Sequence, residues 1–391
     1  MEDQYQSRIN NLNELLANRL AVYPKRDESS VRLNDGLKEF STYLLKTVDF
    51  DGFQPDHLIV EGVERFYDTP IFVCGAMKSG TSLCNRLLDN HPNLLVMPGD
   101  SHFINQIERW NRSQFTEIAE YWINRVVNPT GAEPFWFLGP DEKQLKCFLQ
   151  YLHYFLLHSQ YEIYVCVVMS IYAVNATFGQ PTVKKYWVEK TPNNEIHAQM
   201  LYKRFPRAKF LHVIRDPLNN IAALKKLSDI RQRESSPLQS ARFLKRLLQT
   251  AKQNQEVLGK DKYHIFKYEQ LTSDPEKVLN DICIFLDIPF HENLLKPTEN
   301  GRTTTANSMF TESRVTGKIL DQSHSKRFLQ QLSKIEIQDI VTILYREAIE
   351  FGYNWASPDI QIYRMSGFYI QLHWATEKTR SIFRKIRSGF S

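Results

Sequence analysis

The segment PIFVCGAMKSGTSLCNRLLDNHP, residues 70–92, places a loop bounded by two glycines between an apolar run and an amphipathic helix. The run Ile71–Val73 is continuously apolar, as in a strand that is buried on both faces of a parallel sheet. Gly75 and Gly80 permit positive φ and a close approach of the backbone to a ligand. The helix expected to begin near Thr81 would direct the positive end of its dipole at the loop. These features predict a phosphate-binding loop.

This loop differs from the loop of nucleotide kinases and ATPases, which reads G-x-x-x-x-G-K-[ST]. Here Thr81 follows Gly80, and the lysine stands earlier, at Lys78. The Walker lysine is therefore missing, and no Mg²⁺-binding carboxylate can be placed after a strand. A P-loop user of ATP or GTP, such as a small-molecule kinase, remains the alternative function.

The rest of the chain alternates between short β-type runs and helical patterns. Strands are predicted at Tyr186–Glu189, Phe210–Ile214 and His264–Tyr268, and one helix at Ser325–Phe351, ending at Gly352. The aromatic-rich section 103–180 is predicted to form helices that cover the sheet, and its aromatics serve as core or as walls of an acceptor pocket. We therefore expect an α/β fold with a P-loop-like parallel sheet flanked by helices.

Three parts of the chain are expected. Residues 1–66 form an N-terminal helical extension, including an amphipathic helix over 7–22, residues 67–355 form the main domain, and residues 356–391 form a basic C-terminal tail. Within that tail, residues 379–390 (TRSIFRKIRSGF) favour a solvated terminal helix over a membrane anchor.

Composition excludes several classes of protein. The 391 residues are 42% hydrophobic and carry 49 Lys and Arg against 44 Asp and Glu, a mild basic surplus that suits an anionic ligand without requiring nucleic acid. The five cysteines include no C-x-x-C pair, and His153 and His158 lack the spacing of a helical metal pair, so no metal is expected. The polar N-terminus and the short apolar run 163–174, a buried helix or strand, predict a cytoplasmic protein without stable membrane insertion.

Four blocks of the sequence together resemble PAPS-dependent sulfotransferases, where PAPS is 3′-phosphoadenosine 5′-phosphosulfate. The GAMKSGTS loop and the following L-L-D-N-H-P resemble the family's 5′-phosphosulfate loop. The blocks WVEKTPN (187–193), KFLHVIRDPLNNIAA (209–223) and YEQLTSDPEKVLNDICIFLDIPF (268–290) follow in the expected order. The E-K-T-P sequence is similar to the bacterial branch related to protein-tyrosine sulfotransferases. The resemblance covers residues 68–355 and implies a sulfotransferase fold.

The resemblance implies transfer of a sulfuryl group from PAPS to an acceptor hydroxyl or amine, by in-line displacement without a metal. It places the 5′ side of PAPS on the loop and the 3′-phosphate on a permanently charged arginine. Lys78 would stabilise the leaving phosphate, and Lys190 would act on the acceptor side. The cofactor-binding residues that it implies are Lys78, Ser79, Gly80, Thr81, Ser82, Arg215, Tyr268, Arg314 and Lys318.

The base that takes the acceptor proton has two candidates. In the cytosolic branch it is a histidine two residues after the lysine, but Pro192 occupies that position here. In the bacterial branch a carboxylate soon after the H-P pair serves, and Asp100 lies close to that place. His102 is the other candidate, because a histidine titrates near neutral pH.

One departure from the family pattern concerns the 3′-phosphate, because Ala223 stands where the family usually has a serine. Either Asn219 or Asn220 substitutes for that donor, or Arg215 and a basic loop at 314–318 hold the phosphate alone. Such departures also suggest a second alternative, a binding module without turnover. The sequence leaves a small-molecule, carbohydrate, lipid or peptide acceptor open, and the oligomeric state unspecified.

Overall fold

The computed structural model describes most of the chain between residues 28 and 355. The described residues are 6–8, 10, 28–106, 109–127, 141–179, 183–304, 315–322, 325–355 and 360. The helix expected over 7–22 falls largely outside the described residues, and so do Arg314 and the basic tail over 379–390.

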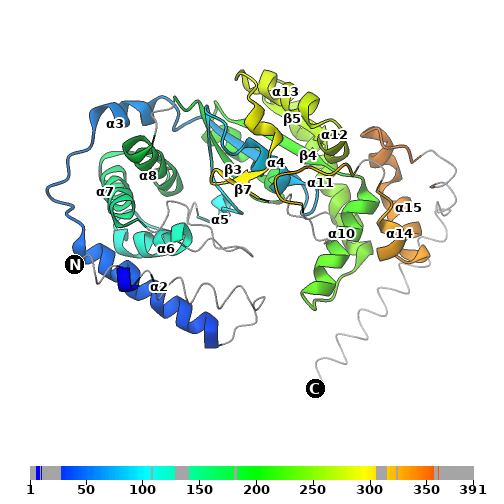
Figure 1. Cartoon of the computed structure of the whole chain (residues 1–391). Helices are drawn as coiled ribbons and strands as arrows, with labels where there is room; N and C mark the ends of the chain where they lie inside the picture. Colours follow the sequence, from blue (N-terminus) through cyan, green and yellow to red (C-terminus); the bar gives the residue numbers. More distant parts are fainter. Residues whose placement is uncertain are drawn as a thin grey trace.

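A five-stranded parallel sheet forms the centre of the molecule (Figure 1). Its strands are β1 (Pro70–Cys74), β2 (Leu94–Val96), β3 (Tyr186–Lys190), β4 (Lys209–Ile214) and β5 (Tyr263–Lys267). They lie in the order β2-β3-β1-β4-β5, so that β1 pairs with β3 on one side and with β4 on the other. Ligands of open α/β sheets bind at the carboxyl ends of the strands, where the strand order reverses, and here that place is the end of β1.

Alternation along the strands buries both faces of this sheet. In β1, Phe72 and Cys74 point into one core, while Ile71 and Val73 point into another. The first core continues into the helices α7 (Glu142–His158) and α8 (Ile163–Phe178), and the second is closed by α4 (Thr81–Leu88) and α13 (Pro275–Leu286). The mixed α/β fold with a parallel sheet flanked by helices, predicted from the sequence, is thus confirmed.

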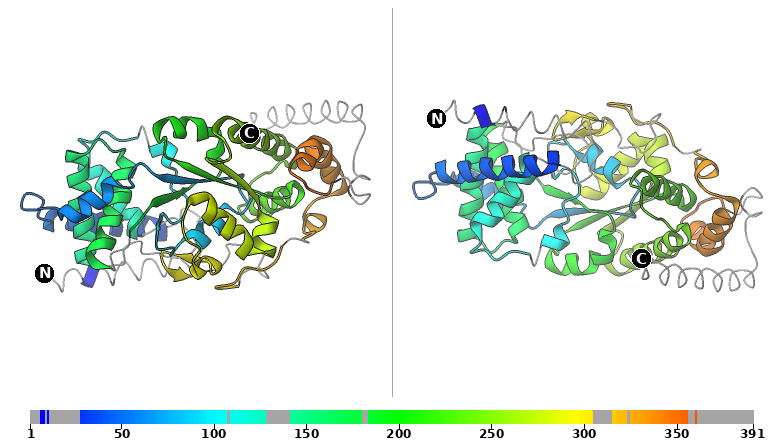
Figure 2. Two further views of the ribbon diagram at one scale, coloured as in Figure 1. Left: turned by 90° about the horizontal axis from the view of Figure 1, so that it is seen from above. Right: turned by 90° about the horizontal axis from the view of Figure 1, so that it is seen from below.

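Helices from both halves of the chain enclose the sheet (Figures 1 and 2). In Figure 1 one group lies to the left: α2 (Glu28–Thr47), α3 (His57–Glu64), α6 (Phe115–Val127), α7 and α8. A third hydrophobic core joins the helices on the right: α10 (Pro217–Ile230), α11 (Pro237–Leu258), α14 (Phe328–Gln331) and α15 (Lys334–Glu350). The remaining elements are short or peripheral: α5 (Phe103–Gln106), η1 (Asn194–His197), α9 (Ala198–Arg204), α12 (Tyr268–Ser273), η2 (Glu292–Leu295), β6 (Thr298–Glu299) and β7 (Arg302–Thr303).

The single helix expected over Ser325–Phe351 is wrong, because the structure has two helices there. The short α14 ends at Gln331, and α15 begins at Lys334. Ser333 starts the second helix with a capping box, in which its hydroxyl accepts from Glu336 N and the Glu336 carboxylate accepts from Ser333 N. This reciprocal cap satisfies backbone donors at a helix start and therefore favours a new helix at this point.

A smaller prediction is also resolved. The run 163–174, expected as a buried helix or strand, lies in α8 and is buried over most of its length. All five cysteines are buried and free. Within the described residues, no helix is both long enough and apolar enough to cross a membrane.

Candidate functional site

The loop between β1 and α4 has a backbone that only glycine fits at its two ends. Gly75 has a φ of +140°, and a Cβ placed there would lie 2.5 Å from Val213 O and 2.6 Å from Ser79 Oγ. Gly80 has a φ of +111° and precedes α4, and its missing Cβ makes room for the ring of Tyr268. The two glycines predicted to shape the loop therefore allow it to turn tightly against its neighbours.

Three other segments fasten the loop through its carbonyl oxygens. Asn193 N donates to Gly75 O at 2.9 Å, and the Asn220 side-chain amide donates to Met77 O at 3.2 Å. The Arg215 guanidinium donates to Lys78 O at 3.1 Å. The first amides of α4, which follow this fastened loop, belong to a helix N-terminus and therefore lack intrahelical acceptors.

Two side chains make the loop a fitting anion site. Ser79 is 1% exposed, and its hydroxyl has no hydrogen-bond partner among the described residues. A buried hydroxyl without a partner is costly, and an anionic oxygen would satisfy it. The pKa of Lys78 is lowered to about 8, first by burial and then by the positive charge of Arg231 at the end of α10. A negatively charged ligand would offset both effects.

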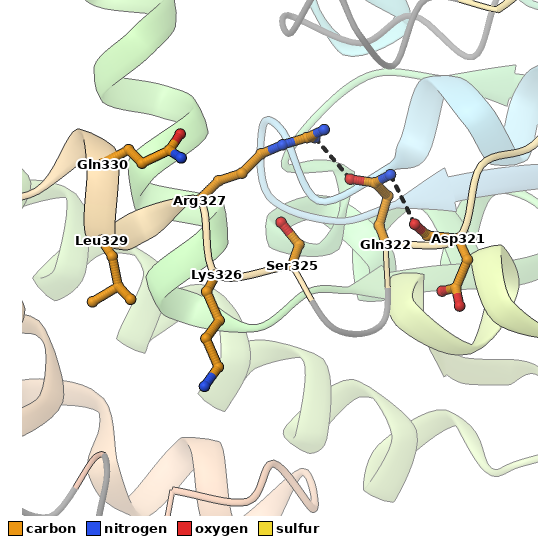
Figure 3. A pocket seen from close by; sticks show the side chains of 7 residues that line it. All are labelled: Asp321, Gln322, Ser325, Lys326, Arg327, Leu329 and Gln330. Carbon is orange, nitrogen blue, oxygen red and sulfur yellow. Dashed lines mark hydrogen bonds between the residues drawn. The ribbon is translucent and has the colours of Figure 1, made fainter.

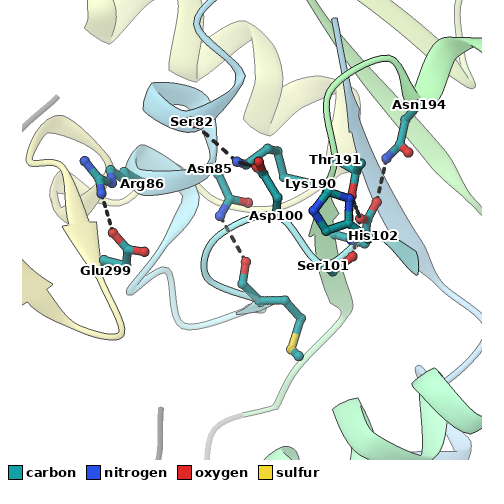
Figure 4. Close-up of polar contacts among 12 residues, drawn as sticks. Ser82, Asn85, Arg86, Asp100, Ser101, His102, Lys190, Thr191, Asn194 and Glu299 are labelled. Atoms are coloured by element: carbon teal, nitrogen blue, oxygen red, sulfur yellow. Dashed lines mark hydrogen bonds and ion pairs between the residues drawn. The ribbon is translucent and has the colours of Figure 1, made fainter. Parts of the chain in front are cut away.

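A second lysine faces the same loop from β3. The Lys190 side chain is only 4% exposed, and its ammonium donates to Ser82 Oγ at 3.2 Å and forms an ion pair with Asp100. Figure 4 shows the three side chains pointing toward one another. The Asp100 side chain is 42% exposed, so the carboxylate lies between a buried cation and solvent. The structure thus brings Lys190 and the first base candidate together.

The other base candidate, His102, lies beside this pair. Its φ is +55° and its side chain is exposed. Its backbone N donates to Thr191 Oγ1 at 2.9 Å, which ties the 100–103 segment to the residue after Lys190. Both candidates therefore lie next to the end of β3 that carries Lys190.

Arg215 and Tyr268 form the opposite side of the site. The Arg215 guanidinium lies over the Tyr268 ring, 4.7 Å from its centroid, and the ring in turn packs against Gly80. Burial raises the pKa of the Tyr268 phenol, and the charges of Arg215 and Arg327 act against that rise. The structure therefore brings Tyr268, Arg215 and the loop together.

An open groove of about 540 Å³ lies beside Arg327, around the start of α14. Figure 3 shows Arg327 directed to Gln322, to which it donates at 2.7 Å, while Lys326 points the other way. Seven residues line the groove: Asp321, Gln322, Ser325, Lys326, Arg327, Leu329 and Gln330. Lys318 lies earlier on this segment and is exposed.

The helix after Arg215 bears on the question raised by Ala223. Ala223 is 3% exposed, so it is covered by protein in this structure. The Asn219 side-chain amide donates to Ser325 O at 2.9 Å, and that of Asn220 donates to Met77 O. Each asparagine thus uses one of its two side-chain amide hydrogens on a neighbouring segment.

Two buried glutamates were missed by the sequence analysis, although both lie in or next to the WVEKTPN block. Glu189 is fully buried on β3 and accepts hydrogen bonds from Ser101, Thr191 and Asn194. Glu195 is fully buried on η1 and accepts from Gly75 N at 3.0 Å. For Glu189 the sequence does carry a signal, since this carboxylate stands within an otherwise apolar strand. Glutamates are almost never buried without partners, so a glutamate at such a position indicates a bound partner.

Across the part of the chain that the structure describes, no group of three or more His, Cys, Asp or Glu side chains could hold a metal ion.

Comparison with known proteins shows the family of the chain. The model of the sulfotransferase family matches residues 70–292. No curated protein matches the sequence. The sulfotransferase domain from the curacin biosynthetic pathway is 17% identical, with a TM-score of 0.46, and the match covers 72% of this chain and 97% of that domain. For a sulfotransferase from Mycobacterium tuberculosis H37Rv the identity is 15% and the TM-score 0.39, with 88% of this chain and 92% of that one covered.

Glu195 gives a stability prediction. Burial raises its pKa from the ordinary 4.5 to about 7, so the folded protein binds this proton more tightly than the unfolded chain does. Its contribution to the free energy of unfolding is therefore complete below pH 4.5 and is lost as the pH rises through 7. Glu195→Gln, which keeps the shape without a titrating proton, should remove roughly 1 to 3 kcal/mol of this pH dependence.

Urea unfolding at pH 5 and pH 8 measures the effect. His212, whose pKa burial lowers to about 3, has the opposite pH dependence but is present in both proteins, so it cancels in the comparison. Identical pH dependence in the wild type and the variant would show that Glu195 titrates normally.

Proposed function

Because the chain belongs to the sulfotransferase family, we propose that this transferase moves a sulfuryl group from PAPS to an acceptor hydroxyl or amine. The observation that carries the proposal is the meeting of Lys78, Lys190 and Asp100 around a glycine-bounded loop, in which the buried Ser79 hydroxyl has no hydrogen-bond partner among the described residues. Family membership and the absence of a lysine after Gly80 argue against the kinase alternative.

The charges around the loop suit sulfuryl transfer. Sulfuryl transfer, like phosphoryl transfer, is expected to pass through a loose transition state, in which negative charge spreads over the bridging and equatorial oxygens. Positioning of the reactants and stabilisation by cations therefore matter most. Lys78 would lie against the oxygen that bridges sulfur and the 5′-phosphate, and Lys190 would lie on the acceptor side. Ser79, Thr81 and Ser82 would donate to the 5′ end, and Arg215 would bind the 3′-phosphate.

The residues of the site can accept the proton and stabilise the charge that the reaction produces. The acceptor oxygen or nitrogen forms a bond to sulfur as the bond from sulfur to the 5′-phosphate oxygen breaks, which leaves 3′-phosphoadenosine 5′-phosphate (PAP). The acceptor proton passes to the Asp100 carboxylate, which opens toward solvent beside Lys190. Charge that develops on the leaving oxygen is stabilised by the Lys78 ammonium.

Nucleotide binding is the first test. We expect the protein to bind PAP without divalent metal, and ATP more weakly, because only PAP offers a 3′-phosphate to Arg215. Arg215→Ala should weaken PAP binding by about 10- to 100-fold, the effect of losing a charge-assisted contact of roughly 1.5 to 3 kcal/mol.

Calorimetry with and without chelator measures this, with adenosine 5′-phosphate as the control ligand. Arg215 also fastens Lys78 O and covers Tyr268, so a modest loss for the control is expected. Equal losses for both ligands, equal wild-type affinity for ATP and PAP, or binding that a chelator abolishes would contradict the assignment.

Lys78→Ala should lower turnover at saturating PAPS by roughly 10²- to 10³-fold, because it removes one electrostatic stabiliser of the transition state. Mass gain of one sulfuryl group on a panel of acceptors gives the readout. Lys326→Ala, which removes an exposed lysine that points away from the Arg327–Gln322 contact, is the matched control. Unchanged turnover in Lys78→Ala would show that Lys78 does not stabilise the transition state.

Asp100→Asn should abolish most acceptor-dependent turnover while PAP affinity stays within about twofold, since the amide keeps the shape but cannot accept the proton. His102→Ala is the paired variant. If His102→Ala proves inactive and Asp100→Asn active, the role of base passes to the histidine.

A further inference from the structure

Glu189 holds the segment that carries Asp100 through three side-chain hydrogen bonds, and their donors Ser101, Thr191 and Asn194 are labelled in Figure 4. Its Oε1 atom accepts from the hydroxyls of Ser101 and Thr191, the latter at 2.6 Å, and its Oε2 atom accepts from the Asn194 amide at 2.6 Å. All three donors belong to segments at the carboxyl end of the sheet. One carboxylate thus joins the 100–103 segment to the K-T-P-N-N segment.

The backbone favours one direction for these hydrogen bonds. Thr191 Oγ1 accepts from His102 N at 2.9 Å, and Ser101 Oγ accepts from Phe103 N at 3.1 Å. With a lone pair of each hydroxyl used in this way, each hydroxyl proton is left to donate to Glu189. An ionised carboxylate, which only accepts, suits a position that faces two hydroxyls and an amide.

Stability alone is a poor reason for a carboxylate at this position. Glu189 is fully buried, so its charged form bears the whole cost of desolvation, and burial raises its pKa. Lys190, its neighbour along the chain, forms an ion pair with Asp100 instead. A buried charge is often no more stabilising than an apolar side chain of similar size, so its value lies in fixing one arrangement of the groups that it binds.

We propose that Glu189 is a positioning residue: it fixes the 100–103 segment so that Asp100 meets Lys190 on the acceptor side of the site. This inference rests on the proposed function for its effect on turnover, but its structural part stands independently. Glu195 does the corresponding work for the phosphate loop, because it binds Gly75 N. The two carboxylates, six positions apart, thus serve opposite sides of the same site.

Glu189→Gln tests the proposal, because its amide nitrogen cannot accept from the hydroxyls and its single oxygen cannot serve all three donors. Displacing the base by about 1 Å can cost on the order of 100-fold, so acceptor turnover should fall by roughly 10- to 100-fold. PAP affinity should stay within about twofold. Hydrogen exchange of the backbone amides in 98–106 should accelerate, while exchange in 75–88 stays unchanged.

Two further variants provide matched controls. Glu195→Gln, another buried glutamate, should alter exchange in 75–88 rather than in 98–106. Glu347→Gln replaces a carboxylate that is 2% exposed on α15 and is bound by Gln249 and Lys245, away from the site. It should leave turnover, PAP affinity and exchange in both segments as in the wild type.

The outcomes separate this inference from the proposed function. Failure of the wild type to bind PAP or to transfer sulfate would overturn the proposed function, and exchange in 98–106 would still decide whether Glu189 holds that segment. Unchanged exchange in Glu189→Gln overturns the inference. Faster exchange in Glu189→Gln with unchanged turnover, in a protein whose wild type is active, also overturns the inference. So does a loss of PAP affinity as large as the loss of turnover, because it would indicate a general structural role.

Discussion

The close approach of Gly75 to β4 is the constraint on which the rest of the site depends. A side chain there would collide with Val213 O and Ser79 Oγ, so only glycine lets the chain leave β1 and turn back across the sheet edge. That turn brings Lys78 O within reach of Arg215 at the end of β4 and Gly75 O within reach of Asn193 after β3. The ends of three neighbouring strands thereby converge on one loop, as parallel pairing of β3, β1 and β4 requires.

Because these strand ends converge, positive charge is concentrated around the partly buried phosphate loop. Lys78 lies near Arg231 and Lys190, and burial together with these like charges lowers its pKa to about 8. The protein offsets part of this repulsion itself, since Asp100 pairs with Lys190. The remaining positive charge and the Ser79 hydroxyl, which has no hydrogen-bond partner among the described residues, suit an anion with several oxygens. The phosphosulfate donor that we propose for this member of the sulfotransferase family fits that description.

The sequence predicted the elements that local patterns encode and missed those that depend on distant contacts. The continuous apolar run of β1 and the glycines of the loop indicated the strand, the turn and the helix that the structure contains. The strand β2 has only three residues, Leu94–Val96, too few for periodicity to distinguish. The motif S-x-x-E at Ser333 indicates the start of α15, but it lies within a longer helical pattern that favours one continuous helix. By contrast, the bond from Gly75 to Glu195 joins residues 120 positions apart, so no local pattern carries it.

The position of Asp100 follows from packing as well as from hydrogen bonds. Three residues later, Phe103 is 1% exposed and meets the rings of Phe72 and Tyr164 at centroid distances of 5.9 and 5.0 Å. Phe72 belongs to β1, the strand that leads into the phosphate loop, and Tyr164 belongs to α8. The segment that carries Asp100 is thus anchored in the core that the sheet shares with the helices around α7 and α8. Because densely packed cores transmit displacement rather than absorb it, substitutions in these helices can move Asp100 relative to Lys190 without touching either residue.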